Sequence, residues 1–417
     1  MPRLTSHDTI DVDALRVGMF VHLDLGWLAH PFPLSSFRIT SDDQIATIRS
    51  LGLAKVRWSA SQSDVPAPPP AAAPQPAAPA APSPEEQARA QHRAALARQR
   101  ESLARCEQQF AEAARECKRA AELVAAQPQQ AAEQAAGLTR ALMDKMLGEH
   151  DLCIRLLGEA AGDKASAHAL NVTIVAMLMA RTFGMAEADL MDLGVGALLH
   201  DIGKLELPDR VRHREDHFSP AESRAYEEHV GHGVAHARRM GLTPGASLVI
   251  AQHHEHADGS GFPLKLNTDR MTALARIVAL VNRYDNLCNP NLAARALTPH
   301  EAVSLLFAQW RSRFDTAILG AFIKMMGVYP PGSAVQLTDD RYALVVAVNS
   351  SRPLKPRVLV HQSGVPREEA LILDLEKSDG LGIRRSLRPQ QLPEATRLYL
   401  APRPRVAYFF EPVRDEE

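Results

Sequence analysis

The sequence lacks several features that would point to large classes of protein. It has only four cysteines, without C-x-x-C spacing, so we expect neither a disulfide framework nor a thiolate zinc site. No apolar run is long enough to cross a bilayer, and no secretory signal pattern is visible, so we expect a cytoplasmic protein without a membrane span. The formal net charge of -2 makes binding of a nucleic acid polymer unfavourable.

The chain has the composition and length of several folded units. Hydrophobic residues make up 46% and charged residues 23% of the 417 residues, as in soluble globular proteins. This length exceeds what one hydrophobic core supports. Changes in composition predict a small α/β N-terminal module (1–64), an Ala/Pro linker (65–84), a connecting helix (85–128), a helical domain (129–328) and a β-rich C-terminal appendage (329–417).

The first module contains two strand patterns and one helix pattern. "GMFVHLDLGW" (18–27) alternates like a strand, "SDDQIATIRSLGL" (41–53) begins with capping residues and continues at helical spacing, and "AKVRWS" (54–59) predicts a closing strand. The Ala/Pro tract that follows cannot bury a core and is expected to be an extended, semi-stiff spacer. We expect this module to regulate or localise the rest of the chain.

Residues 85–126 are rich in Ala, Glu, Arg and Gln, which favours a helix with a thin apolar stripe. Such a helix is either a solvated connector or half of a dimerising pair, which would make the protein a homodimer through 85–128. Residues 130–328 contain repeated helix starts, in which Ser, Thr or Asp precedes Pro or Glu. The tail alternates apolar and polar residues. The sequence therefore predicts a mainly α fold with small α/β and β-rich additions.

Histidine is unusually concentrated in the helical region. Ten of the 17 histidines lie between His168 and His256. A divalent metal that activates water needs nitrogen and oxygen ligands from several elements. The candidates for such a site are His168, His200, Asp201, His229, His253 and His254.

The stretch "LLHDIGK" (198–204) constrains how such a site can be built. Neighbours on a helix diverge by about 100°, so His200 and Asp201 cannot both face one ion as residues four apart do. A carboxylate can instead bridge two ions while the adjacent histidine binds one of them. Lys204, four residues after His200, is expected on the same face and near any bound phosphate. The alternatives are a buried, hydrogen-bonded histidine and a lysine that caps a helix C-terminus.

Residues 149–326 resemble the HD-GYP family of metal phosphohydrolases, because they combine the motifs "HDIGK", "HVGHG" and "HHEHADGSGFP". The N-terminal stretch is similar to a domain of unknown function (DUF3391) that often precedes HD-GYP domains. The resemblance implies an HD-type helical bundle that hydrolyses cyclic di-GMP to pGpG or GMP with two divalent ions, iron or manganese. It implies that the six candidates are metal ligands, that Asp201 bridges the ions and that Lys204 holds the phosphate. A substrate-binding turn would comprise Gly259, Gly261, Phe262 and Pro263.

The chain departs from the family pattern at four places. Asn282 replaces a late aspartate ligand, and an amide oxygen binds such metals more weakly than a carboxylate. Lys164 stands where family members with a third metal have a glutamate, so at most two ions are expected. Phe262 replaces a tyrosine. The arginine of the family's "RPY" segment is missing, but Arg295 lies nearby in the sequence and is a candidate substrate contact.

These observations leave three functions open. The first is a two-metal phosphodiesterase that acts on cyclic di-GMP or a related phosphate ester. The second is a degenerate HD-GYP module that binds a ligand or a partner, such as a GGDEF-type diguanylate cyclase, without turnover. The third is an HD hydrolase of another substrate, such as a nucleotide. The fold alone cannot separate these possibilities.

Overall fold

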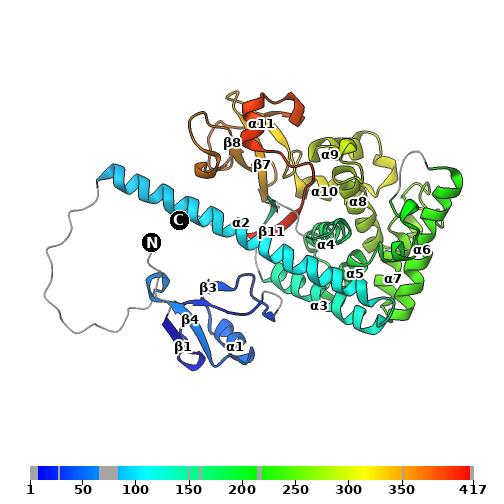
Figure 1. Ribbon diagram of the computed structural model, residues 1–417, viewed down its shortest axis with the longest axis horizontal. Helices are drawn as coiled ribbons and strands as arrows, with labels where there is room; N and C mark the ends of the chain where they lie inside the picture. Colours follow the sequence, from blue (N-terminus) through cyan, green and yellow to red (C-terminus); the bar gives the residue numbers. More distant parts are fainter. Residues whose placement is uncertain are drawn as a thin grey trace. The chain divides into compact units, whose positions relative to one another are not determined.

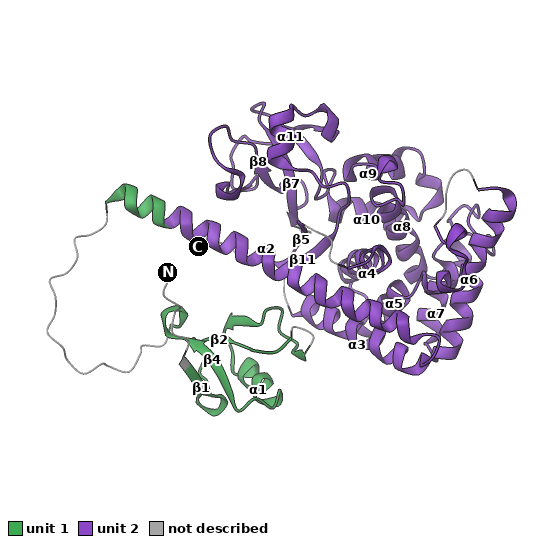
Figure 2. Cartoon of the chain, viewed as in Figure 1, with its two compact units in different colours: residues 1–90 green, residues 91–417 purple. Residues whose placement is uncertain are grey.

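The computed structural model describes residues 8–26, 29–64, 83–148, 151–158, 162–213, 218–349 and 352–413. The chain forms two compact units, residues 1–90 and 91–417 (Figure 2). Most of the Ala/Pro linker predicted for 65–84 lies outside the described residues. Within the described residues, every helix is too short or too polar to traverse a bilayer.

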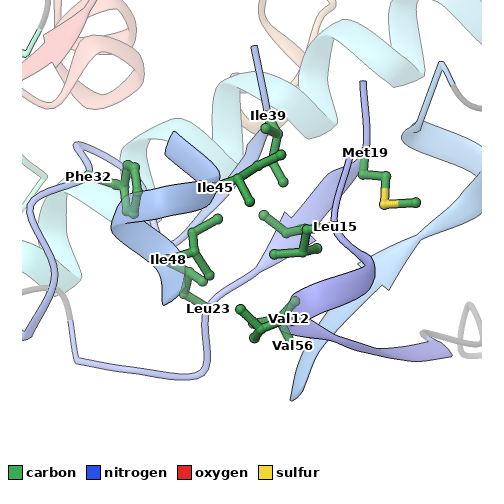
Figure 3. Close-up of a cluster of buried hydrophobic side chains, with 10 residues drawn as sticks. Val12, Leu15, Met19, Leu23, Phe32, Ile39, Ile45, Ile48 and Val56 are labelled. Carbon is green, nitrogen blue, oxygen red and sulfur yellow. The ribbon is translucent and has the colours of Figure 1, made fainter. Parts of the chain in front are cut away.

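The first unit is a four-stranded antiparallel sheet with one helix. Its strands are β1 (Asp8–Asp11), β2 (Phe20–His22), β3 (Ser36–Arg38) and β4 (Lys55–Ser59), in the order β1-β4-β2-β3. Ser41 caps α1 (Asp42–Ser50), because its side chain accepts a hydrogen bond from the Gln44 amide at 3.4 Å. Ile45 and Ile48 of α1 lie in one buried cluster with Leu15 and Val56 (Figure 3). The predicted α/β module is thus confirmed.

The long helix predicted near residues 85–126 is α2 (Pro84–Leu123). A two-sided contact joins it to the C-terminal part of the chain: the Gln99 amide donates to the Ala370 carbonyl at 3.2 Å and accepts from the Ile372 amide at 2.9 Å. Further along α2, Phe110 and Ala113 are fully buried. The apolar stripe is therefore partly used within the chain itself, and dimerisation through this helix stays a prediction.

Helices α3 to α10 form the predicted bundle. Helix α4 is buried on nearly all sides, packs against α3, α5, α8 and α10, and lies at the centre of the bundle (Figure 1). Helix starts follow the expected chemistry: Ser219 and Thr298 each form a capping box with the glutamate three residues later. The helices are α3 (Pro128–Leu147), α4 (Lys164–Thr182), α5 (Glu187–Leu198), α6 (Pro220–Met240), α7 (Pro244–Gln252), α8 (Ala273–Cys288), α9 (Pro299–Ala308) and α10 (Thr316–Met326).

The C-terminal strands form one antiparallel sheet with a strand from the helical region. That strand, β5 (Leu152–Leu156), was not predicted, and it pairs with both β7 and β11. All five residues of β5 are buried, so no polar alternation marks it in the sequence. The other strands are β6 (Ala334–Leu337), β7 (Tyr342–Asn349), β8 (Arg357–Val360), β9 (Ile372–Asp374), β10 (Ile383–Leu387) and β11 (Tyr408–Pro412), with α11 (Glu394–Leu400) before β11.

Candidate metal centre

The His200–Asp201 pair lies in a turn and not on a helix, which corrects the sequence-based expectation. Helix α5 ends at Leu198, and the chain continues into the short 3-10 helix η4 (Ile202–Glu206). Lys204 therefore does not share a helical face with His200. The tighter turn brings its Nζ to Asp201, where it donates a hydrogen bond to Oδ2 at 2.6 Å.

The structure brings the six candidate side chains together in two groups that share Asp201. One group contains Asp201, His229, His253 and His254, and the other contains His168, His200 and Asp201; in each group one donor atom per residue lies within 4.8 Å of the others. Asp201 Oδ1 lies 3.6 Å from Nε2 of both His229 and His253. Asp201 Oδ2 lies 3.6 Å from His168 Nε2 and 3.5 Å from His200 Nε2. Each carboxylate oxygen therefore faces its own pair of imidazoles.

Backbone carbonyls fix the protonation pattern of three of the rings. The Nδ1 atoms of His200, His229 and His253 donate to the carbonyls three residues earlier, at 2.7, 2.5 and 2.8 Å. A carbonyl oxygen can only accept, so Nδ1 carries the proton in each ring. Burial lowers the pKa of His200 well below its usual range and that of His229 to about 3, so these rings are neutral. Their Nε2 atoms therefore present lone pairs.

These lone pairs face one another, and this arrangement fits a bound cation. His168 Nε2 and His200 Nε2 lie 3.2 Å apart, and His229 Nε2 and His253 Nε2 lie 3.3 Å apart. In the second pair the Nε2 atom of neutral His229 is an acceptor. Asp201 Oδ1 and His254 Nε2 are buried, with no hydrogen-bond partner among the described residues. Nitrogen and oxygen donors without thiolate suit divalent metals such as iron or manganese.

Asp285 orients His168 from behind, a role that the sequence did not reveal. His168 Nδ1 donates to Asp285 Oδ2 at 2.6 Å, and Asp285 Oδ1 accepts from the amides of Asn171 and Asn289 at 2.8 and 2.9 Å. A carboxylate behind a ligating imidazole fixes its orientation and raises its basicity. The sequence carries no signal for this role, because a side chain that acts through a ligand has no spacing pattern of its own.

Glu255, the third residue of "HHE", stabilises the turn that follows the histidines by hydrogen bonds. It is fully buried, and its two oxygens accept the backbone amides of Leu264 and Leu266 at 2.7 and 2.8 Å. Within this turn, the Phe262 ring stacks on His254 with centroids 4.4 Å apart. Gly259 has φ +76°, a conformation that favours glycine. The predicted turn of Gly259, Gly261, Phe262 and Pro263 therefore packs directly on the histidine cluster.

The remaining candidates lie at different depths. Asn282 is buried on α8, one turn before Asp285, and its Oδ1 accepts a hydrogen bond from Asn286 Nδ2 at 2.6 Å. Lys164 is exposed at the start of α4, one turn before His168. Arg295 is exposed at the end of the 3-10 helix η7 (Ala293–Arg295). The roles of all three stay predictions.

Asp201 and Lys204 form a charged pair at the edge of the cluster. Their side chains are 19% and 18% exposed, so this edge of the otherwise buried site reaches solvent. Burial alone would raise the pKa of the Asp201 carboxyl, but the Lys204 ammonium and the neighbouring histidines together hold that pKa well below its usual range. Asp201 is therefore an anion at neutral pH, as a metal-bridging carboxylate must be.

The metal-free protein is expected to lose stability on acidification below pH 6.5. An unfolded histidine binds a proton near pH 6.5, whereas burial lowers the pKa of native His229 to about 3. Between these values the unfolded state binds more protons, so stability falls as pH falls, by several kcal/mol. Thermal unfolding in chelator at pH 7.5, 6 and 5 measures this. The His229→Gln variant should show a weaker dependence of melting temperature on pH. The control His92→Gln, on the exposed surface of α2, should not change this dependence. A wild-type melting temperature independent of pH would contradict the prediction.

The central helical bundle and the paired His/Asp groups define an HD-domain phosphodiesterase. Residues 121–318 match the HD domain family, and residues 7–135 match a family described as a domain of unknown function (DUF3391). The chain therefore contains an HD domain and, in its N-terminal part, a DUF3391 domain, which supports the resemblance to the HD-GYP family.

Known relatives support this assignment. The chain is 28% identical to cyclic di-GMP phosphodiesterase PA4108 of Pseudomonas aeruginosa over 84% of both chains. It is 31% identical to 3'3'-cGAMP-specific phosphodiesterase 2 of Vibrio cholerae over 31% of this chain and 25% of that protein. A solved structure, Bd1817, a HDG"Y"P protein from Bdellovibrio bacteriovorus, aligns over 76% of this chain and 98% of its own with 15% identity and a TM-score of 0.42.

Proposed function

We propose that the protein hydrolyses cyclic di-GMP to pGpG or GMP in bacterial second-messenger signalling, with two divalent ions, iron or manganese, in the paired groups. The observation that carries this proposal is the position of Asp201, whose two oxygens each lie 3.5 to 3.6 Å from two imidazole Nε2 atoms. A carboxylate in this position is suited to bridge two cations. The activity of PA4108, which is similar over most of both chains, supports cyclic di-GMP as the substrate.

The residues of the site have separable tasks in this reaction. When bound, two divalent ions would generate a nucleophile from water at neutral pH and stabilise the attacking and leaving oxygens. His168, His200, His229, His253 and His254 would hold the ions with Asp201, and Asn282 would be a weak additional ligand. Lys204, already beside Asp201, would neutralise charge on the phosphate. The turn of Gly259, Gly261, Phe262 and Pro263 and the Arg295 side chain would contact the substrate.

A degenerate, non-catalytic module is the second candidate, and Asn282 is the observation that favours it. Its amide oxygen is already hydrogen-bonded to Asn286 at 2.6 Å, and an amide brings no negative charge to the site. A protein with weakened metal binding would still recognise a ligand or a GGDEF-type diguanylate cyclase. The intact donor groups around Asp201 support the enzyme more strongly.

Metal content and turnover of the same purified protein test the proposal. Elemental analysis should find up to two iron or manganese ions per chain, and incubation with cyclic di-GMP should release pGpG or GMP. Cyclic GMP-AMP and linear nucleotides are the comparison substrates. Metal-loaded protein that binds cyclic di-GMP without hydrolysing it would select the non-catalytic module, and hydrolysis of nucleotides alone would select another substrate class.

Replacing Asn282 with aspartate is expected to strengthen metal retention and raise activity. The substitution restores a charged oxygen ligand at nearly unchanged volume, and a carboxylate binds iron or manganese more tightly than an amide. We expect about tenfold tighter retention in a chelator titration, which corresponds to about 1.4 kcal/mol. Asn286→Asp, one turn further on α8, introduces the same charge and is the control. An Asn282→Asp variant that retains metal no better than wild type would show that Asn282 is not a ligand.

A further inference from the structure

A tryptophan and two arginines form a compact cluster that is linked to segments of the candidate metal centre. The Arg283 Cζ lies 4.3 Å from the Trp310 ring centroid, and the Arg313 Cζ lies 5.1 Å from it. Both distances are within cation–π range, which is about 6 Å. Arg313 belongs to the short 3-10 helix η8 (Arg311–Arg313), and Arg283 comes from α8. Stacking restricts both guanidinium groups, and for Arg313 it leaves the in-plane N–H groups to bind an anion.

The cluster is attached to two of the segments that supply site residues. Arg283 directly follows Asn282 on α8. The Arg313 carbonyl accepts a hydrogen bond from the Ala257 amide at 2.8 Å, and Ala257 lies three residues after His254. The rings of His256 and Phe314 add an edge contact with centroids 5.9 Å apart. These contacts fix the Trp310 cluster relative to the turn that packs on the histidines.

The 3-10 helix η8 carries positive charge that the surrounding carboxylates neutralise only partly. Neither Arg311 nor Arg313 forms a salt bridge with a carboxylate among the described residues. Asp315 is engaged elsewhere, because it accepts from Arg276 Nη1 at 2.6 Å and caps the start of α10. Asp258 Oδ1 accepts from the Ser260 amide at 3.0 Å. An anionic ligand therefore gains charge-assisted hydrogen bonds here without displacing an existing salt bridge of Arg313.

We propose that Arg283 and Arg313, held by Trp310, form a phosphate-binding subsite for the nucleotide ligand of this protein. The identity of that ligand rests on the proposed function: a cyclic dinucleotide has two phosphates, and the one that is not at the metal centre binds this subsite. The Arg313 guanidinium supplies the bidentate contact that phosphate favours, and Arg283 adds a second positive charge on the same indole ring. The subsite thereby contributes to affinity and to the choice of a dinucleotide over a mononucleotide.

Tryptophan fluorescence tests the subsite without requiring turnover. The chain has three tryptophans, so Trp27→Phe/Trp58→Phe in the full chain leaves Trp310 as the sole indole reporter. Cyclic di-GMP titrated in the presence of chelator should change its emission. Arg283→Gln and Arg313→Gln should each weaken binding by about tenfold or more. Arg311→Gln is the matched control, because this guanidinium lies 5.9 Å from the Phe307 ring instead of Trp310.

Steady-state kinetics of the metal-loaded enzyme separate this inference from the proposed function. Arg313→Gln should raise KM for cyclic di-GMP about tenfold with kcat unchanged, and Arg313→Lys should recover only part of the loss. Hydrolysis with unchanged Trp310 emission and an unchanged KM in Arg313→Gln overturns the subsite and leaves the proposed function standing. Binding that weakens in the Arg283 and Arg313 variants without any hydrolysis supports the subsite and refutes the phosphodiesterase. Equal weakening by all three arginine variants indicates general electrostatic attraction and overturns the subsite.

Discussion

Replacing Asp201 with alanine is expected to remove bound metal and to lower phosphodiester turnover by at least about three orders of magnitude. The side chain supplies both oxygens that face the four imidazole Nε2 atoms. Without them, neither donor group retains a carboxylate ligand, because the other members of both groups among the described residues are histidines. The Lys204 ammonium also loses its partner at 2.6 Å and is left as an uncompensated positive charge that repels cations.

Elemental analysis and a cyclic di-GMP assay of the same preparation measure both losses of the Asp201→Ala variant. Asp209→Ala is the matched control, since this carboxylate lies in the same segment but is 90% exposed and pairs only with Arg212 in the described contacts. It should retain both metal and activity. A second variant, Asp201→Asn, keeps the volume of the side chain, so that a loss of metal can be distinguished from a folding defect. Metal content and turnover at wild-type levels in Asp201→Asn would refute the bridging role.

The histidine cluster could be predicted from the sequence because its signal is chemical and repeated. Five histidines and one aspartate occur in separate motifs, and a bundle of short-looped helices leaves few ways to direct them except inward. The helix starts were equally accessible, because residues such as Ser219 and Thr298 satisfy backbone amides whatever the helix packs against. Local chemistry of this kind does not depend on the rest of the fold.

The turn at the His200–Asp201 pair could not be predicted in the same way. Apolar residues continue from Val195 through Leu199, so periodicity alone extends the helix past its observed end at Leu198. Contact with α6 determines the actual conformation, because the chain must lie directly against that helix to bring Asp201 to His229. Asp285 and Glu255 were missed for a related reason, since both act through hydrogen bonds to partners that only the folded chain brings near.

Gly203 is the residue that permits this contact, and replacing it with alanine is expected to disrupt the site. A Cβ at position 203 would lie 1.9 Å from the His229 carbonyl oxygen and 2.4 Å from the Gly233 amide nitrogen, both of which are backbone atoms of α6. No side chain can move to relieve such a clash, so η4 must separate from α6. That movement carries Asp201 and Lys204 away from His229 and opposes the contact of buried His236 with Glu206 at 3.0 Å.

For Gly203→Ala we therefore expect a loss of about 3 kcal/mol or more of stability, which lowers the melting temperature by roughly 5 to 10 °C, together with loss of metal. Gly231→Ala is the matched control, because Gly231 is an exposed residue of α6 whose added Cβ meets nothing within 4 Å. Alanine there should stabilise the helix by up to about 1 kcal/mol. Thermal unfolding and elemental analysis compare the two variants. If Gly203→Ala melted like Gly231→Ala and kept its metal, close backbone contact between η4 and α6 could not be what positions Asp201.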